Sequence, residues 1–175
     1  DLEKEIRALG VKPIIIGHSM GGLLAQMLAA RGLAKAIVLL APASPAGILA
    51  LTPSVIKSFW SVMTVWQFWK KPMRLSFDDA VYAMLHLLPI EQQHQAYSHF
   101  VYESGQAAFE IGYWLLDAKH ATRVETEKVT CPVLVLVGTE DRITPLSVQR
   151  KIVDKYKALA TYREFPDHAH WLIGE

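Results

Sequence analysis

The chain has 175 residues, of which 51% are hydrophobic and 20% charged, so it contains ample apolar material for a buried core. A net charge of +1 provides no basic surface for nucleic acid or for an anionic membrane. The single cysteine, Cys131, excludes an internal disulfide and gives no support to an oxidising compartment, so we expect a cytoplasmic location.

The N-terminal part of the chain predicts a helix, a strand and a second helix. Apolar residues recur at helical spacing over residues 2–9. A β-branched run at residues 14–16 leads into Gly-His-Ser-Met-Gly at residues 17–21, and an apolar helical pattern follows. Residues 13–30 carry no charge over a length close to that of a membrane span. Glycine, histidine, serine and glutamine interrupt this stretch, so we expect no membrane span.

The motif Gly-x-Ser-x-Gly places Ser19 between the predicted strand and the predicted helix. A serine hydroxyl is a weak nucleophile, so it has to project from a sharp turn to a position that a base can reach. Crowding in such a turn explains Gly17 and Gly21, and Gly22 lets the helix lie close to the sheet. The turn also aims the N–H of Met20 at the place where an oxyanion would form. The alternative is a glycine-rich turn with an incidental serine.

The second apolar run, residues 36–41, is typical of a parallel-sheet strand that is buried on both faces. From residue 44 to residue 128 the character changes, because four of the five tryptophans lie there. These aromatic side chains either pack between short helices or line an apolar substrate pocket, and the two interpretations are compatible. Amphipathic helices are predicted over residues 53–70, 76–88, 90–103 and 104–118.

At residue 129 the alternation of strands and helices resumes. Residues 132–137 predict a buried strand that ends in Gly-Thr-Glu-Asp, and an amphipathic helix and a short strand at residues 161–165 follow. The chain closes on Asp-His-Ala-His-Trp at residues 167–171. These changes divide the chain into two core parts and a helical cap: residues 1–43, 129–175 and 44–128, respectively.

The polar residues that follow three predicted strands form a chemically sensible set. A nucleophilic serine needs a base, and the base needs an acid that holds its tautomer. Ser19 follows one strand, Asp141 another, and His168 and His170 follow the last. Open parallel sheets present such groups at the carboxyl ends of their strands, and serine, aspartate, histidine is the order of α/β-hydrolases.

On the motifs at residues 17–22, 138–145 and 167–171, the chain resembles the α/β-hydrolase superfamily, specifically its capped esterase and lipase-like members. The resemblance implies an α/β fold with a mostly parallel sheet and a helical cap. It implies that Ser19 is the nucleophile, Asp141 the acid and His170 the base, with the N–H of Met20 as half of an oxyanion hole.

Two of these assignments have rivals within the chain. The family usually has glycine before the catalytic histidine, whereas this chain has Ala169, with His168 one residue earlier. We prefer His170, because the Trp-Leu that follows it matches the family pattern. Glu140 is a rival acid, but Asp141 holds the family position.

Three further residues are expected to contact substrate: His18, which stands where histidine is frequent in the family, Trp114 of the cap, and Trp171. No organic cofactor and no metal are implied, since the remaining histidines lack metal-ligand spacing. The expected partner is a small-molecule ester, with no role for nucleic acid.

The family begins with several strands and with a loop that donates the second oxyanion N–H, and nothing before Pro13 corresponds to these. We therefore expect Asp1–Glu175 to be an internal portion of a longer protein, with the N-terminal part of the sheet missing. Loss of one oxyanion donor typically costs about 10²–10³ in rate, so the chain alone is expected to be weakly active or to associate through an exposed strand edge.

The sequence thus predicts a serine hydrolase that cleaves carboxylic esters of medium, apolar acyl groups through an acyl-enzyme. The same three residues would also serve a thioesterase, a lactonase, an acyltransferase or a cofactor-free haloperoxidase. From a different class, a non-catalytic binding module with the same fold stays open.

Overall fold

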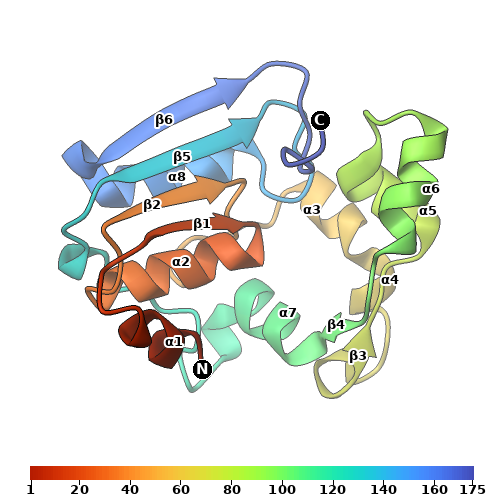
Figure 1. Ribbon diagram of the computed structural model, residues 1–175. Coiled ribbons are helices and arrows are strands. Elements are labelled where there is room, and N and C mark those ends of the chain that lie inside the picture. The colour runs from red at the N-terminus through yellow and green to blue at the C-terminus, as the bar shows by residue number, and fades with distance from the viewer.

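Four parallel strands form the main sheet, in the order β1-β2-β5-β6 (Figure 1). The computed structural model describes residues 1–175, and every neighbouring pair in this sheet is parallel. The carboxyl ends of all four strands therefore lie at one edge, which confirms the predicted α/β fold with a mostly parallel sheet. The strands are β1 (Ile14–His18), β2 (Ala36–Leu40), β5 (Val133–Gly138) and β6 (Ala160–Phe165).

Two helices, α2 (Met20–Ala30) and α8 (Leu146–Tyr156), pack against the same face of the sheet and share one core with it. Both follow directly on a strand end, α2 after β1 and α8 after the turn that ends β5. The strand residues that face them alternate along the chain, as the pleat requires, and are 1% exposed or less: Ile37, Leu39, Val133, Val135 and Val137.

The opposite face of the sheet is less covered. The prediction that β2 is buried on both faces is wrong, because its alternate residues are only half-buried. On β1 the residues that point to this face, Ile14 and Ile16, are 58% and 66% exposed. The reason is that α2, which follows β1, and α8, which follows β5, both lie on the other face.

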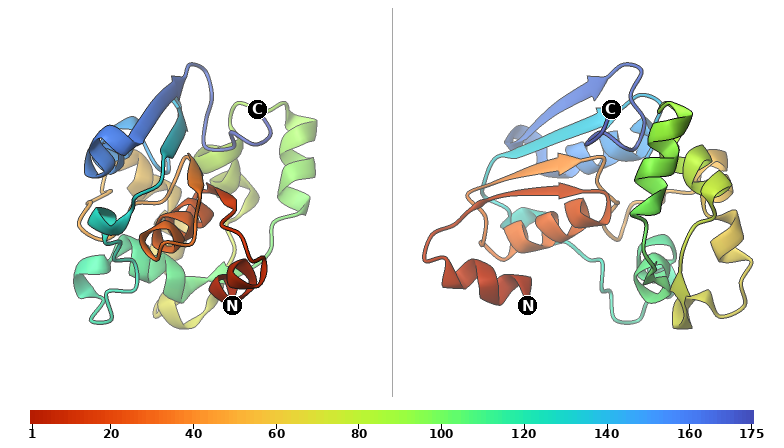
Figure 2. Two further views of the ribbon diagram at one scale, coloured as in Figure 1. Left: turned by 60° about the vertical axis from the view of Figure 1, so that its left-hand side comes forward. Right: turned by 45° about the vertical axis from the view of Figure 1, so that its right-hand side comes forward.

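The segment between β2 and β5 folds into short helices beyond the carboxyl ends of the strands and below the sheet (Figures 1 and 2). The long helix predicted over residues 53–70 is interrupted at Phe59 (φ −112°) and at Gln67 (φ 56°). Its parts are α3 (Pro53–Ser58), α4 (Trp60–Met63) and the 3₁₀ helix η1 (Phe68–Lys70).

The other predicted cap helices are also shorter than expected. A short antiparallel pair, β3 (Pro72–Met73) and β4 (Glu103–Ser104), interrupts them, and no sequence pattern predicts it. The three-part division of the chain stays a prediction. The remaining elements are α1 (Leu2–Ala8), α5 (Phe77–Ala80), the π-helix η2 (Val81–Leu85), α6 (Ile90–Ser98), α7 (Gly105–Gly112), and the 3₁₀ helices η3 (Trp114–Leu116), η4 (Thr126–Lys128) and η5 (Lys157–Leu159).

Aromatic side chains of the cap pack against one another. Phe68 and Trp69 of η1 contact Phe109 of α7, with ring centroids 6.3 and 5.6 Å apart. Packing between short helices therefore accounts for these aromatic residues. None of the helices combines the length and the apolar character that a membrane span requires.

Replacing Leu39, which is fully buried in the core, tests this arrangement. Leu39→Ala leaves a cavity between β2 and the helices, so it should lower the free energy of unfolding by about 2–5 kcal/mol. The matched variant Leu115→Ala changes a leucine that is 71% exposed and should stay within about 0.5 kcal/mol of the parent chain. Urea denaturation followed by circular dichroism measures both, and equal losses would contradict the burial of Leu39.

Candidate active site

The turn between β1 and α2 holds Ser19 in an unusual backbone conformation, with φ 51° and ψ −119°. Residues other than glycine rarely adopt this region, and it costs of order 1–3 kcal/mol. Four backbone hydrogen bonds hold Ser19 in place, one of them from the N–H of Leu23 to the carbonyl of Ser19 at 3.3 Å. Its N–H donates to the carbonyl of Leu40 at 3.0 Å, and its own carbonyl accepts from the N–H groups of Gly22 at 2.9 Å and Ala43 at 2.8 Å. The side chain therefore projects from a fixed turn.

Crowding around the turn explains two of its glycines but not the third. A Cβ on Gly17 would lie 2.2 Å from the carbonyl oxygen of Gly21. A Cβ on Gly22 would lie 2.7 Å from Cβ of Pro42, so Gly22 allows close packing against the turn after β2. The expectation that crowding also requires Gly21 is wrong, because a Cβ there would meet nothing within 4 Å.

Asp141 and His170 are joined by a hydrogen bond at the carboxyl ends of β5 and β6. Nδ1–H of His170 donates to Oδ2 of Asp141 at 2.8 Å. Both residues are buried, with exposures of 1% for His170 and 5% for Asp141. Asp141 comes from the turn after β5, and His170 from the loop after β6.

Four donors surround the carboxylate of Asp141. Oδ1 accepts the N–H groups of Ile143 and Thr144, each at 2.8 Å, and Oδ2 accepts the hydroxyl of Thr144 at 2.7 Å as well as Nδ1–H of His170. Burial alone would raise the pKa of Asp141. The charge of His170 and the hydrogen bonds from His170 and Thr144 outweigh burial, so this pKa lies below the ordinary carboxyl value.

Thr144 was not among the candidate residues, and the hydroxyl three positions after the aspartate was the only signal for it in the sequence.

The rivals within the chain do not enter this arrangement. The side chain of Glu140 is exposed, and Nδ1 of His168 contacts the carbonyl of Pro166 at 2.8 Å instead of a carboxylate. The loop that carries His170 passes directly across the end of β5, where a Cβ on Gly138 would lie 2.1 Å from the carbonyl oxygen of His168. The structure thus brings Asp141 together with His170.

His18, the residue before Ser19, contacts the same loop. Its Nε2–H donates to the main-chain carbonyl of His170 at 2.7 Å, and the two imidazole rings lie 4.9 Å apart. Burial lowers the pKa of His18, and the positive charge of His170 lowers it further. Trp171 packs edge-on against His18 at 6.1 Å and contacts Phe100 of the cap at 6.2 Å. The loop that carries His170 and Trp171 is therefore packed between the turn at Ser19 and the cap.

Two polar groups at the site have no partner within the protein. Nε2 of His170 is buried and makes no hydrogen bond, and it is not bonded to the hydroxyl of Ser19. The N–H of Met20, at the first position of α2, has no acceptor within the helix. The imidazole of His170 thus keeps one ring nitrogen without a partner, and the residue after Ser19 keeps one free backbone donor.

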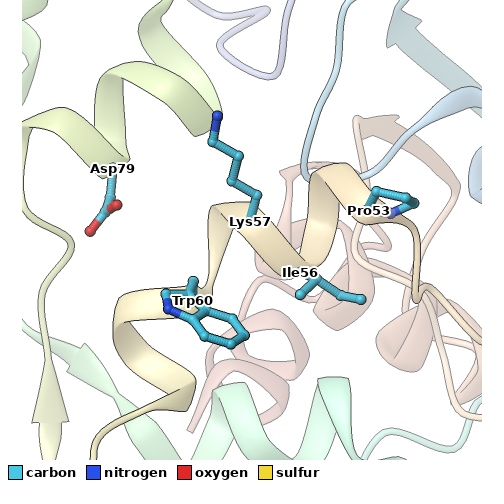
Figure 3. A pocket seen from close by; sticks show the side chains of 5 residues that line it. All are labelled: Pro53, Ile56, Lys57, Trp60 and Asp79. Carbon is cyan, nitrogen blue, oxygen red and sulfur yellow. The ribbon is translucent and has the colours of Figure 1, made fainter.

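No contact joins Trp114 to these residues. It lies half-buried in η3, and its indole N–H has no partner. A cleft of about 550 Å³ opens elsewhere in the cap, between α3, α4 and α5 (Figure 3). None of the candidate site residues lines this cleft. The expectation that a substrate contacts Trp114, His18 and Trp171 therefore stays a prediction. The cleft is lined by Pro53, Ile56, Lys57, Trp60 and Asp79.

The two glycines of the motif are expected to respond differently to alanine. Gly17→Ala forces a Cβ into the backbone of Gly21, so it should destabilise the fold by about 1–3 kcal/mol, as overpacking does. Gly21→Ala has room inside α2 and should stabilise the chain by up to about 1 kcal/mol through helix propensity. Thermal unfolding measures both, and a greater loss from Gly21→Ala would refute the geometry of the turn.

The lowered pKa of His18 predicts a pH-dependent stability. Below about pH 6.5 an ordinary histidine in the unfolded chain takes up a proton that folded His18 resists, so the free energy of unfolding should fall as the pH drops from 7.5 to 5.5. His18→Gln, which keeps a side-chain N–H donor, should lose less stability over this interval. His99→Gln, at an exposed position, is the control and should behave like the parent chain. If the free energy of unfolding of His18→Gln falls with pH as much as that of the parent chain, the prediction is contradicted.

Comparison with solved structures supports the fold. A monoacylglycerol lipase from Paleococcus ferrophilus is 24% identical, with a TM-score of 0.63, and the match covers 97% of this chain and 64% of that one. A serine hydrolase from Cycloclasticus zankles is 22% identical, with a TM-score of 0.60 and coverage of 95% and 60%. A hydrolase from Pseudomonas aeruginosa is 19% identical, with a TM-score of 0.64 and coverage of 97% and 62%.

The chain thus spans less than two thirds of the length of these solved proteins. No curated protein sequence matches it at a significant level. The family described as serine aminopeptidase, S33, matches residues 5–175, which is almost the whole chain. Together with the parallel sheet and the strand-end residues described above, this match shows that the chain belongs to the S33 serine aminopeptidase family of α/β-hydrolases.

Proposed function

We propose that the chain carries the nucleophile, the acid and the base of a serine hydrolase that cleaves carboxylic esters. The observation that supports this most is the buried hydrogen bond between Asp141 and His170 beside the strained turn at Ser19. A charged carboxylate is costly to bury, and a hydrogen bond to Nδ1 is the arrangement that makes Nε2 of an imidazole a base.

In the proposed first half-reaction, Oγ of Ser19 attacks the carbonyl carbon of the ester, and Nε2 of His170 takes the hydroxyl proton. Asp141 holds Nδ1–H and stabilises the imidazolium. The N–H of Met20, free at the start of α2, donates to the oxyanion. The tetrahedral intermediate then collapses, the alkoxide leaves, and His170 returns the proton to it as an alcohol.

In the second half-reaction a water molecule gives a proton to His170 and attacks the carbonyl carbon of the acyl-enzyme. The bond from that carbon to Oγ then breaks, His170 returns the proton to Oγ of Ser19, and the carboxylic acid is released. The absence of a direct bond between Ser19 and His170 is compatible with this scheme, because catalytic hydrogen bonds often tighten only in the complex with substrate. Aromatic residues near the site, Trp171 and Phe100, favour an apolar acyl group of medium length.

The family description favours a second candidate, the release of an N-terminal amino acid from a peptide. The chemistry of the three residues would be the same, with an amine as the leaving group. A p-nitrophenyl ester of a medium fatty acid and an aminoacyl p-nitroanilide separate the two candidates, because we expect the ester to have the higher kcat/KM. Faster turnover of the anilide would favour the aminopeptidase.

Ser19→Ala tests the proposed nucleophile. It should lower kcat/KM for the p-nitrophenyl ester by at least about 10³-fold, since no other group takes the place of the nucleophile. Asp141→Asn should cost about 10⁴-fold, because the amide favours the wrong tautomer of His170. Ser147→Ala, on the exposed side of α8, is the matched control and should leave the rate unchanged.

Peptide mapping after treatment with a fluorophosphonate separates an enzyme from a binding module. We expect one adduct, on Ser19, in the folded chain. Full hydrolysis by Ser19→Ala would refute the assignment of Ser19 as the nucleophile. A folded chain without an adduct at Ser19 would favour the binding module.

A further inference from the structure

The turn that follows β2, residues 41–44, is buried and accepts hydrogen bonds from side chains of α2 and α8. Ala41 is fully buried, and Ser44 is 5% exposed. Gln149 of α8 donates to the carbonyl of Pro42 at 2.9 Å, and Gln26 of α2 to that of Ala43 at 3.4 Å. Helices α2 and α8 therefore both hold this turn in place, and we refer to it as the β2 turn.

The turn at Ser19 is attached to the β2 turn by its backbone. The N–H of Ala43 donates to the carbonyl of Ser19 at 2.8 Å, and the N–H of Ser19 donates to Leu40, the last residue of β2, at 3.0 Å. Pro42 packs so closely on Gly22 that no Cβ fits there. Any displacement of the β2 turn therefore also displaces Ser19.

Thr144 attaches the acid and the base to the same turn. Its hydroxyl oxygen lies 2.7 Å from Oδ2 of Asp141, 3.2 Å from the carbonyl oxygen of Ala41 and 3.4 Å from Nδ1 of His170. The hydroxyl has one proton, which points mainly to the nearer and charged Oδ2 and is shared with the carbonyl oxygen of Ala41 in a longer, bifurcated hydrogen bond. With 6% exposure, Thr144 is too buried to serve as a surface contact for substrate.

We propose that Thr144 is a positioning residue, whose hydroxyl sets the Asp141–His170 pair relative to Ser19 by joining the carboxylate to the β2 turn. This inference rests on the proposed function, because it assigns a role within the same site. Thr144 is the one side chain that contacts Asp141, His170 and the β2 turn together. A hydrogen bond joins Ser19 to Ala43, and the backbone leads from Ala43 to Ala41. Hydrogen bonds then join Ala41 to Thr144, Thr144 to Asp141, and Asp141 to His170.

Thr144→Val isolates the hydroxyl, because valine has nearly the same shape and keeps the backbone N–H that donates to Oδ1. Asp141 retains three of its donors, the N–H groups of residues 143 and 144 and Nδ1–H of His170. We expect kcat for the p-nitrophenyl ester to fall about 10- to 10²-fold through misplacement of the base, with KM within about twofold. Thr144→Ser restores the hydroxyl and should recover kcat to within about twofold of the parent.

The pH dependence of kcat/KM provides a second test, because the loss of a purely structural contact would leave it unchanged. Without the threonine donor, the negative charge on Oδ2 is less neutralised and holds a protonated His170 more strongly, so the acid limb of kcat/KM should move to higher pH. The other titratable groups around His170, namely His18, His168 and Glu175, are unchanged in the variant.

Thr122→Val is the matched control. Thr122 is also buried, at 5% exposure, and its hydroxyl donates to the carbonyl of Glu110 at 3.2 Å and not to Asp141, His170 or the β2 turn. This variant loses the same kind of hydrogen bond and should keep the parent kcat and pH profile. If Thr144→Val does not fold, as judged by circular dichroism, Thr144→Ala makes the same comparison without the β-branched side chain.

A measurement without turnover separates this inference from the proposed function. In ¹H–¹⁵N NMR spectra, the Nδ1–H signal of His170 should shift in Thr144→Val, return in Thr144→Ser and stay in place in Thr122→Val. An unchanged signal with unchanged kcat would overturn the role of Thr144 and leave the proposed function standing. Full hydrolysis by Ser19→Ala, run in parallel, would overturn the proposed function itself.

Discussion

The buried carboxylate of Asp141 is the constraint on which the site depends. Removing a charge from water costs several kcal/mol unless the protein replaces the lost hydrogen bonds. Here Ile143, Thr144 and His170 supply four donors to its two oxygens. Three of these donors come from the turn after β5 that carries Asp141 itself, and the fourth, His170, comes from the loop after β6, which the parallel sheet brings to the same edge.

The rest of the fold fixes the position of the turn at Ser19 relative to Asp141 and His170. Two hydrogen bonds tie Ser19 to the end of β2 and the turn after it, and Gly17 and Gly22 allow the close approach that these bonds require. His18, at the end of β1 directly before Ser19, adds a hydrogen bond to the carbonyl of His170. The strain at Ser19 is therefore held by contacts on every side of the turn, which is how unfavourable backbone conformations persist at functional sites.

The sequence predicts those features whose physical causes are local. The β-branched runs and the glycine-rich motif located the four parallel strands, and the strand-end positions of Asp141 and His170 followed from them. Features that depend on distant contacts were predicted wrongly or not at all. The space around Gly21, the half-buried face of β2 and the break at Gln67 depend on packing partners far along the chain. The role of Thr144 depends on Ala41, about a hundred residues earlier, as its hydrogen bond across 103 positions shows.

The most direct measurement is a crystal structure of the chain after reaction with an alkyl phosphonate, a mimic of the tetrahedral intermediate. The account predicts phosphorus bonded to Oγ of Ser19 and one phosphonate oxygen within about 3 Å of Nε2 of His170. A second oxygen should accept the N–H of Met20, while the Asp141–His170 hydrogen bond persists. Phosphorus on another residue, or an imidazole turned away from the adduct, would contradict the central claim.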